Sequence, residues 1–164
     1  TIGASYAYTS GGTRYDSGSY TTTTISIDGY GTVTKSQTIG VSTRENKVIG
    51  SYTTTSLFGL DGQQTDGQTI GESRNISGMA TGAYTTTSVF NQTYGIMADQ
   101  TTIGLSFSYD AVGNRYDSGS YTTTTISIDG YGTVTKSQTV GVSTRENKVI
   151  GSYTTISLSC KAPI

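Results

Sequence analysis

The chain has 164 residues and a formal net charge of −1, with 32% hydrophobic residues, 22 Gly, 13 Tyr, one Cys, one Pro and no His or Trp. Without His, and with a single Cys, it lacks the usual ligands of zinc and haem sites and the imidazole of Ser-His-Asp and Cys-His nucleophile systems. Scattered basic residues argue against a nucleic-acid partner, and no apolar run approaches the roughly 18 residues of a membrane helix.

Threonine, serine and glycine supply 77 of the 164 residues (33 Thr, 22 Ser and 22 Gly). Disordered chains also have low hydrophobicity, but they combine it with high net charge and few aromatic or β-branched residues. Here charged residues are only 13%, and the strand formers Thr, Val, Ile and Tyr are abundant. The composition predicts an ordered β protein with a thin core of Thr methyl groups, Tyr rings and sparse Ile and Val.

The predicted strands begin at residues 19–28, where two sets of side chains alternate between the faces. One face carries Thr21, Thr23, Ile25 and Ile27, and the other carries Tyr20, Thr22, Thr24, Ser26 and Asp28. Asp28-Gly29 follows as a tight-turn signal in which Gly takes the positive φ. The next strand is expected over 32–41, and the charged run 44–47 predicts a turn. The Asp-Gly hairpin signal recurs at Asp61-Gly62, Asp66-Gly67 and Asp129-Gly130.

The sequence is repetitive at two periods. Residues 14–57 recur at 115–158 with an offset of 101, differing only at Ile39/Val140 and Thr55/Ile156. The phrase Gly-x-Tyr-Thr-Thr begins at Gly18, Gly50, Gly82, Gly119 and Gly151, with spacings of 32, 32, 37 and 32. A second phrase, Thr-Ile/Val-Gly, ends at Gly3, Gly40, Gly71, Gly104 and Gly141. Each unit therefore holds two strand-like segments, which suits an antiparallel meander whose units pack on their neighbours.

We predict an all-β fold of antiparallel β-hairpin repeats, with units of about 32, 32 and 37 residues in a 101-residue period, forming a sandwich, a strip or a solenoid. The expected organisation is a partial repeat at 1–16, repeat units at 17–48, 49–80, 81–117 and 118–149, and a partial repeat with a divergent tail at 150–164. Because the chain begins inside a repeat, we expect it to be a segment of a longer repetitive polypeptide.

The string from Tyr109 to Arg115, Tyr-Asp-Ala-Val-Gly-Asn-Arg, resembles the YD repeat of the Rhs family, whose units carry a Tyr-Asp-x-x-Gly-x-x core. Ile-Asp-Gly-Tyr-Gly-Thr-Val-Thr at 27–34 and 128–135 is similar to a degenerate version of that core, with Ile in place of Tyr. The resemblance implies a long strip of antiparallel hairpins, secreted or displayed on a surface, winding into a spiral shell or fibre. The 32/32/37 spacing and the Tyr-Thr-Thr phrase depart from the usual pattern of that family.

Two side-chain patterns allow a binding or a structural interpretation. Alternating Thr residues would present a hydroxyl-and-methyl lattice to ice, a polysaccharide or a mineral, but Tyr and charged turns interrupt them, and Thr is a good strand residue. Tyr rings stack on sugars, but these Tyr residues recur once per unit, which favours a ladder between units. They are Tyr20, Tyr52, Tyr84, Tyr121 and Tyr153.

Paired carboxylates are the only catalytic chemistry that the composition leaves open. Asp61 and Asp66 are close in sequence and Asp16 follows Tyr15, but nothing singles out a pair of the kind that glycosidases need. The Asp-Gly loops lack the dense acids of a Ca²⁺ loop, and Gly29-Tyr30-Gly31 lacks the third Gly of a dinucleotide loop. We therefore predict no catalytic, cofactor-binding or metal-binding residues and no cofactor, and we expect that the protein is not an enzyme.

Three residues carry possible covalent chemistry. Asn75 and Asn91 lie in Asn-x-Ser/Thr sequons, which a chain so rich in Ser and Thr also contains by chance, so their glycosylation stays open. Cys160 stands where the repeat breaks down, and it either joins chains through a disulfide or is a small buried residue.

These features predict a non-enzymatic, extracellular or cell-surface structural protein that self-assembles into a filament, sheath or surface layer. Its expected partners are copies of itself, with a surface polysaccharide as a further candidate and with neither nucleic acid nor a membrane span. Strand edges without charge or proline are templates for another chain, so the unit at 1–16 or the tail after Tyr153 is expected to pair with an adjacent subunit. The alternative is a glycan-binding segment of a surface adhesin, or part of an Rhs-like β shell.

Overall fold

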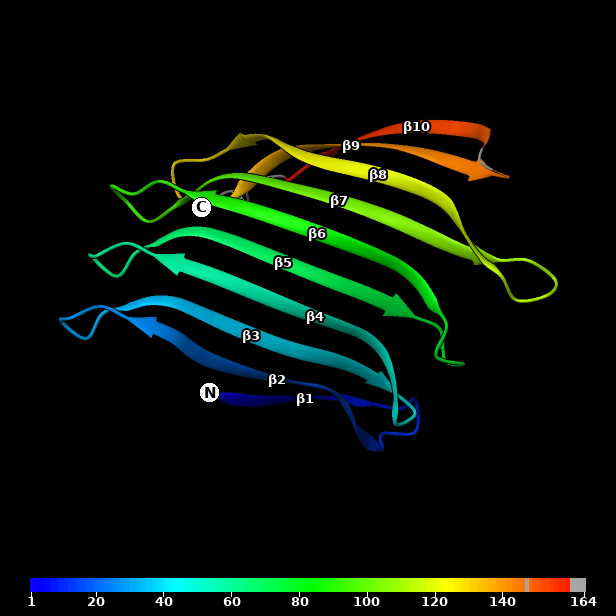
Figure 1. Cartoon of the computed structure of the whole chain (residues 1–164), viewed down its shortest axis with the longest axis horizontal. Coiled ribbons are helices and arrows are strands. Elements are labelled where there is room, and N and C mark those ends of the chain that lie inside the picture. Colours follow the sequence, from blue (N-terminus) through cyan, green and yellow to red (C-terminus); the bar gives the residue numbers. More distant parts are fainter. Residues whose placement is uncertain (147, 160–164) are drawn as a thin grey trace.

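The computed structural model describes residues 1–146 and 148–159. It contains ten strands: β1 (Ile2–Tyr8), β2 (Arg14–Ile27), β3 (Val33–Arg44), β4 (Lys47–Phe58), β5 (Gln64–Arg74), β6 (Ala80–Phe90), β7 (Met97–Tyr109), β8 (Arg115–Ile128), β9 (Val134–Arg145) and β10 (Lys148–Leu158). They form one sheet in chain order, and every neighbouring pair is antiparallel (Figure 1). The predicted all-β hairpin fold is confirmed, and its form is an open strip rather than a sandwich or a solenoid.

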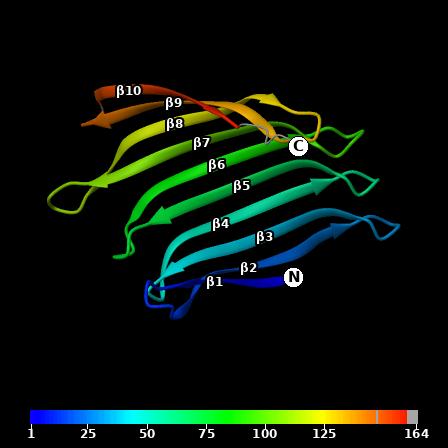
Figure 2. The same cartoon turned by 180° about the vertical axis from the view of Figure 1, so that it is seen from behind.

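The sheet is a single layer, and no other element of the described residues covers either face (Figure 2). Among the described residues no hydrophobic side chain is buried. The buried residues there are all glycines: Gly18, Gly40, Gly71, Gly104, Gly119 and Gly141. The thin core expected from the composition is therefore absent within one chain, and the strands are held by their hydrogen-bond ladders and by side chains that pack across strands.

Every even-numbered strand carries a β-bulge directly before the glycine of its Gly-x-Tyr-Thr-Thr phrase. The pairing skips one residue in each strand: Ser17, Ile49, Thr81, Ser118 and Ile150. A bulge bends its strand and increases the local twist. Because the five bulges lie at the same level of the sheet, the strands bend together near one end (Figure 1).

Several hairpin loops share an Asp/Asn-x-x-Gly pattern. In loop 28–32 the Asp28 carbonyl accepts a hydrogen bond from the Gly31 N–H (3.2 Å), and the Asp28 carboxylate accepts from the N–H groups of Tyr30 (2.9 Å) and Thr32 (2.8 Å). Gly31 has φ +91°. This is a type I turn followed by a left-handed glycine, so the positive φ falls three residues after Asp28. The expectation that Gly29 takes the positive φ is wrong for that reason.

The same loop geometry recurs in the second copy of the repeat and in two further loops. The left-handed residue is Gly132 after Asp129, Gly113 after Asp110 and Gly78 after Asn75. The expectation for Asp129-Gly130 fails in the same way as that for Asp28-Gly29. The string that resembles a YD repeat thus forms the end of β7, a hairpin loop and the first residue of β8.

Two other turn predictions have opposite outcomes. Asp66-Gly67 does not form a hairpin, because loop 59–63 already reverses the chain and both residues lie within β5, opposite Leu57 and Ser56. The turn at 44–47 is confirmed. Glu45 and Asn46 have φ values of 51° and 59° and join β3 to β4 as a two-residue hairpin.

The face alternation predicted for β2 holds only over part of the strand. The residues of β2 pair in regular sequence with β3 up to Thr24, which lies opposite Ser36. Between Thr24 and Ile27 the register shifts twice, so the two alternating sets do not extend to Asp28.

Candidate functional site

One row of residues across the sheet alternates glycine and tyrosine. From β1 to β10 the row reads Gly3, Tyr20, Gly40, Tyr52, Gly71, Tyr84, Gly104, Tyr121, Gly141 and Tyr153. Each Tyr ring lies over the glycine of the preceding strand, where a Cβ atom would clash with the ring edge and the hydroxyl. We call this row the Tyr–Gly ladder. It places the five tyrosines as their spacing predicts, and it joins the two sequence phrases.

The next row on the same face is threonine throughout, and its first member directly precedes β1. Its members are Thr1, Thr22, Thr38, Thr54, Thr69, Thr86, Thr102, Thr123, Thr139 and Thr155. Thr22 exchanges both backbone hydrogen bonds with Thr1, so its pairing with Thr38 is a non-hydrogen-bonded pair, in which side chains lie closest. Their Oγ1 atoms are 2.8 Å apart.

The same side-chain bond recurs wherever an even-numbered strand meets the next odd-numbered strand. It joins Thr54 to Thr69, Thr86 to Thr102 and Thr123 to Thr139, each at 2.8 Å. We call this set of residues the threonine row. Its regularity shows that the four even-to-odd junctions of the chain share one register.

The opposite face carries an apolar row. The odd-numbered strands contribute Ile2, Ile39, Ile70, Ile103 and Val140, each opposite a threonine of the neighbouring strands. Their exposed fractions run from 49% at Val140 to 83% at Ile2. Half-exposed aliphatic side chains thus recur on every second strand of this face.

The two outermost strands differ from the inner ones in exposure. In the described chain, β1 and β10 each have a neighbour on one side only. Residues 148–158 of β10 repeat residues 47–57 of β4 with one change, Ile156 for Thr55. All eleven residues are exposed in β10, whereas seven of the eleven are half-buried in β4. A neighbouring strand on the second side accounts for the difference.

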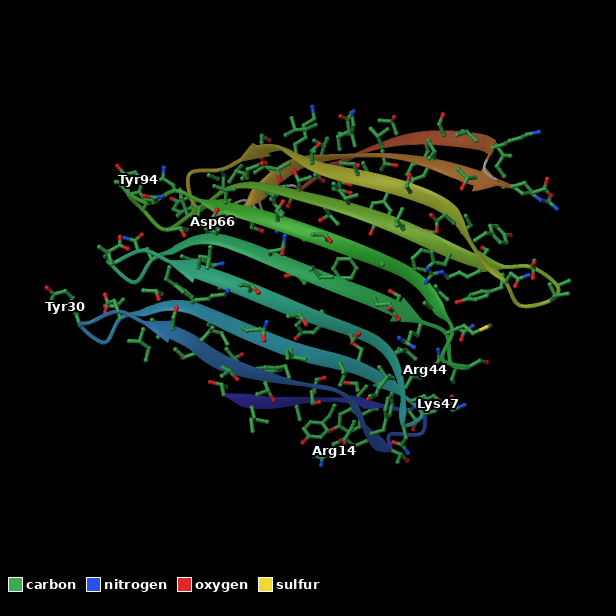
Figure 3. The ribbon with its side chains drawn as sticks, viewed as in Figure 1. Arg14, Tyr30, Arg44, Lys47, Asp66 and Tyr94 are labelled. Atoms are coloured by element: carbon green, nitrogen blue, oxygen red, sulfur yellow. The ribbon has the colours of Figure 1, made fainter. Side chains whose placement is uncertain are left out.

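Most of the basic side chains in the described chain gather at one end of the strands (Figure 3). Arg14, Arg44 and Lys47 lie at one end, and Tyr30 and Tyr94 lie at the loop tips of the other. The first end also carries Arg74, Arg115, Arg145 and Lys148, each the first or last residue of a strand. The edge strands are different: residues 1–8 and 149–159 contain no charged side chain and no proline.

A hollow at the arginine end occurs once in each copy of the repeat. The first is lined by Thr9, Tyr15, Arg44, Glu45 and Asn46. The second lies 101 residues further on and is lined by Tyr109, Asp110, Ala111, Tyr116, Arg145 and Glu146. An aromatic ring beside a guanidinium and a carboxylate is a surface suited to polar ligands with one apolar face.

Two loop carboxylates have shifted pKa values. The backbone N–H of Thr32 holds the pKa of Asp28 below its ordinary value of 3.8. The side-chain amide of Asn114, whose Nδ2 donates to Oδ2 at 2.9 Å, lowers the pKa of Asp110 in the same way. Since both carboxylates accept backbone hydrogen bonds within their own loops, their role is to hold the loop conformation.

The carboxylates considered for catalysis are not brought together as a group. Asp16 lies near the start of β2, opposite Tyr6. Asp66 lies in β5 toward the other end of the strands (Figure 3), and Asp61 accepts a hydrogen bond from the Gln63 N–H in its own loop (3.1 Å). Within residues 1–146 and 148–159 no three His, Cys, Asp or Glu residues group as metal ligands would. That part of the chain also has no helix with the length and apolarity to cross a membrane.

Both sequon asparagines open hairpin loops. Asn75 accepts hydrogen bonds at Oδ1 from the N–H groups of Ser77 and Met79 (both 3.0 Å), and Asn91 accepts from Thr93 (2.8 Å) and Tyr94 (3.2 Å). Cys160, considered above for a disulfide, lies outside the described residues.

Sequence reasoning did not foresee that the Gly-x-Tyr-Thr-Thr phrase of one strand pairs with the Thr-Ile/Val-Gly phrase of the next. Tyr20 lies opposite Gly40 and Thr22 lies opposite Thr38, so Tyr-x-Thr in one strand meets Thr-x-Gly in the next. The reversed order of the two phrases is what antiparallel pairing requires, and this signal was present in the sequence. Comparison of the chain with protein-family models, with curated proteins and with solved structures finds no match.

Proposed function

We propose that this chain is a non-enzymatic structural protein, extracellular or on the cell surface, that self-assembles into a filament, sheath or surface layer by pairing strands between copies. One observation carries the proposal. The described chain is an open single-layer sheet whose edge strands carry no charged side chain along residues 1–8 and 149–159, and it has no buried hydrophobic side chain.

Pairing with a strand of another copy would supply the hydrogen-bond partners that the edge strands of a single chain lack. An unpaired edge presents a row of backbone N–H and C=O groups that another strand can satisfy. The contrast between β10 and β4 indicates how much surface that strand would cover, since seven of the eleven shared positions change from exposed to half-buried. Each added copy would therefore extend the ladder and shield side chains on both faces.

The distribution of charge supports assembly at the edges. The arginines of the described residues, together with Lys47 and Lys148, are the first or last residues of strands (Figure 3), while Lys35 and Lys136 lie further inside β3 and β9. Proteins that avoid edge pairing place Lys, Pro or inward-facing charges on the edge strand itself. β1 and β10 have no such protection along residues 1–8 and 149–159, so these edge strands are the favoured place for copies to pair.

Truncation within β10 tests the proposal. Removing residues 154–164 deletes half of this edge strand, so we expect loss of polymers in electron micrographs while the β signal in circular dichroism remains. A matched truncation that removes only 160–164 keeps all of β10 and should still polymerise. Unchanged polymers after removal of 154–164, or the absence of polymers from the intact chain, would contradict the proposal.

The second candidate function is glycan binding by a surface adhesin segment or by part of an Rhs-like shell. The recurring hollow with Tyr15, Arg44 and Glu45 in one copy, and Tyr116, Arg145 and Glu146 in the other, favours it. Binding of the monomeric chain to a glycan array, lost in the double variant Tyr15→Ala and Tyr116→Ala, would support this function over assembly.

A further inference from the structure

We propose that copies join head to tail, with β10 of one copy pairing antiparallel to β1 of the next in the register that places Tyr153 opposite Gly3 and Thr155 opposite Thr1. This inference deepens the proposed function and rests on it, because it specifies the joint through which the polymer grows. The interface is heterologous, so it leaves a free β1 and a free β10 at the two ends of any oligomer.

The register follows from four internal junctions of the same type. At each point where an even-numbered strand meets the next odd-numbered strand, the tyrosine of the first lies opposite the glycine of the second: Tyr20 and Gly40, Tyr52 and Gly71, Tyr84 and Gly104, Tyr121 and Gly141. A joint between β10 and the next β1 is again an even-to-odd junction. The strand directions also alternate correctly, since neighbouring strands of the sheet are antiparallel throughout.

The sequence of β1 fits the odd-strand role in this joint. Residues 1–5 read Thr-Ile-Gly-Ala-Ser, and residues 69–73 of β5 read Thr-Ile-Gly-Glu-Ser. β5 is the strand that pairs with β4, and β4 repeats β10 except at Thr55. The chain therefore contains its own template for the joint, in which residues 151–155 of one copy meet residues 1–5 of the next.

The glycine of β10 supplies a second observation. In the inner even-numbered strands, a Cβ atom at this position would lie 2.5 Å (Gly18), 3.5 Å (Gly50), 3.0 Å (Gly82) or 2.7 Å (Gly119) from a backbone carbonyl oxygen of the next strand. A Cβ atom at Gly151 meets nothing within 4 Å. In the inner strands this position is closed by the next strand, tightly at Gly18, Gly82 and Gly119 and with ordinary contact at Gly50, whereas at Gly151 it is open. The glycine of β10 thus matches a position that a further strand would fill.

The threonine row predicts the side-chain contact at the joint. Thr155 stands where Thr54 stands in β4, and Thr1 stands where Thr69 stands in β5. The Oγ1 atoms of Thr54 and Thr69 are 2.8 Å apart. A fifth bond of this kind would connect Thr155 to Thr1 of the next copy and continue both the threonine row and the Tyr–Gly ladder across the joint.

Disulfide trapping tests the register. All proteins carry Cys160→Ser. Thr155→Cys protein is mixed with Thr1→Cys protein as the test. An equal mixture of Thr155→Cys and Ser5→Cys proteins, which places the cysteines out of register, is the control. Non-hydrogen-bonded antiparallel pairs lie within the Cα separation that a disulfide needs. We expect a dimer on a non-reducing gel for the first mixture and at least about tenfold less for the control.

The possible outcomes separate this inference from the proposed function. Equal cross-linking in both mixtures, or none in either while micrographs show polymers, overturns the register and leaves assembly standing. Absence of polymers from the parent chain overturns both. Efficient cross-linking of Thr1→Cys protein with itself would indicate a symmetric contact and would also overturn the head-to-tail joint.

A second variant tests the joint without a cross-link. Gly151→Val places a branched side chain where the monomer has open space and where the joint would bring a backbone carbonyl. We expect the monomer to unfold no more easily than the parent, because Val favours strands over Gly, and the concentration needed for polymers to rise by about tenfold. The matched control is Gly29→Val in the β2–β3 loop, which also has no atom within 4 Å and should polymerise like the parent. Equal polymerisation of both variants would contradict the joint.

Discussion

At the scale of single residues, glycine in this sheet has a packing role opposite to its usual one. A glycine inside a strand normally weakens the strand, because it has no side chain to pack and loses more conformational entropy on folding. Here the tyrosine rings pack directly onto Gly71 and the other glycines of the Tyr–Gly ladder. The aromatic ring covers the bare backbone of the neighbouring strand, so the two residues act as one unit.

Substitution of a glycine in the Tyr–Gly ladder tests this view. Gly71→Ala would displace the Tyr84 ring from the neighbouring strand, and we expect it to lower the free energy of unfolding by about 1–2 kcal/mol in urea titrations. In a Tyr84→Ala background the same substitution should cost less than about 0.5 kcal/mol, because no ring remains to be displaced. Equal costs in the two backgrounds would show that the ring and the glycine are not coupled.

The pKa of Asp110 gives a prediction about pH. Because hydrogen bonds hold it below 3.8, the carboxylate stabilises loop 110–114 above that pH, and the stabilisation is lost as the pH falls through the folded-state pKa. Asn114→Ala removes the largest of these hydrogen bonds, so the pKa of Asp110 should rise toward 3.8. A carbon NMR titration of the carboxyl group measures it, with Asp28 in its distant loop as the unchanged control. An unshifted Asp110 would contradict the assignment.

At the scale of elements, the hairpin loops are set by where the left-handed residue falls. The Asp-Gly pairs predicted turns at the correct places after β2 and β8, but they assigned the positive φ to the wrong glycine. The reason is that the Asp28 carboxylate accepts hydrogen bonds from the N–H groups of the residues two and four positions later. This arrangement requires a longer loop than a two-residue hairpin. The same reliance on dipeptides misplaced a turn at Asp66, where strand pairing on both sides extends through the residue.

Two alanine substitutions in one loop measure this difference. Gly31 has φ +91° and Gly29 has no left-handed φ, and a Cβ atom at either position meets nothing within 4 Å. We expect Gly31→Ala to lower the free energy of unfolding by about 1–2 kcal/mol through backbone strain alone. Gly29→Ala should change it by less than about 0.5 kcal/mol. The reverse order in thermal or urea unfolding would contradict the loop geometry.

At the scale of the whole molecule, the sequence predicted the class of fold but not its single layer. Repeat spacing and alternation were sufficient for antiparallel hairpins in chain order. They could not distinguish a strip from a sandwich, because the half-exposed row of Ile39, Ile70 and Ile103 reads in sequence like the inner face of a second layer. Nor could composition show that glycines would be the buried residues, since their burial depends on what the next strand places over them. Tyrosine rings cover Gly40, Gly71, Gly104 and Gly141, and backbone atoms of the next strand lie close to Gly18 and Gly119.

The central claim is that these sheets extend edge to edge, and the axial repeat of the assembled material tests it most directly. Ten strands at a spacing of about 4.8 Å give an advance of about 48 Å per chain along the direction in which the strands stack. Electron microscopy of polymers formed by the 164-residue chain should therefore show subunits repeating every 48 Å or so, with strands perpendicular to the polymer axis. Polymers whose strands run along the axis, or chains that stay monomeric at high concentration, would contradict the account.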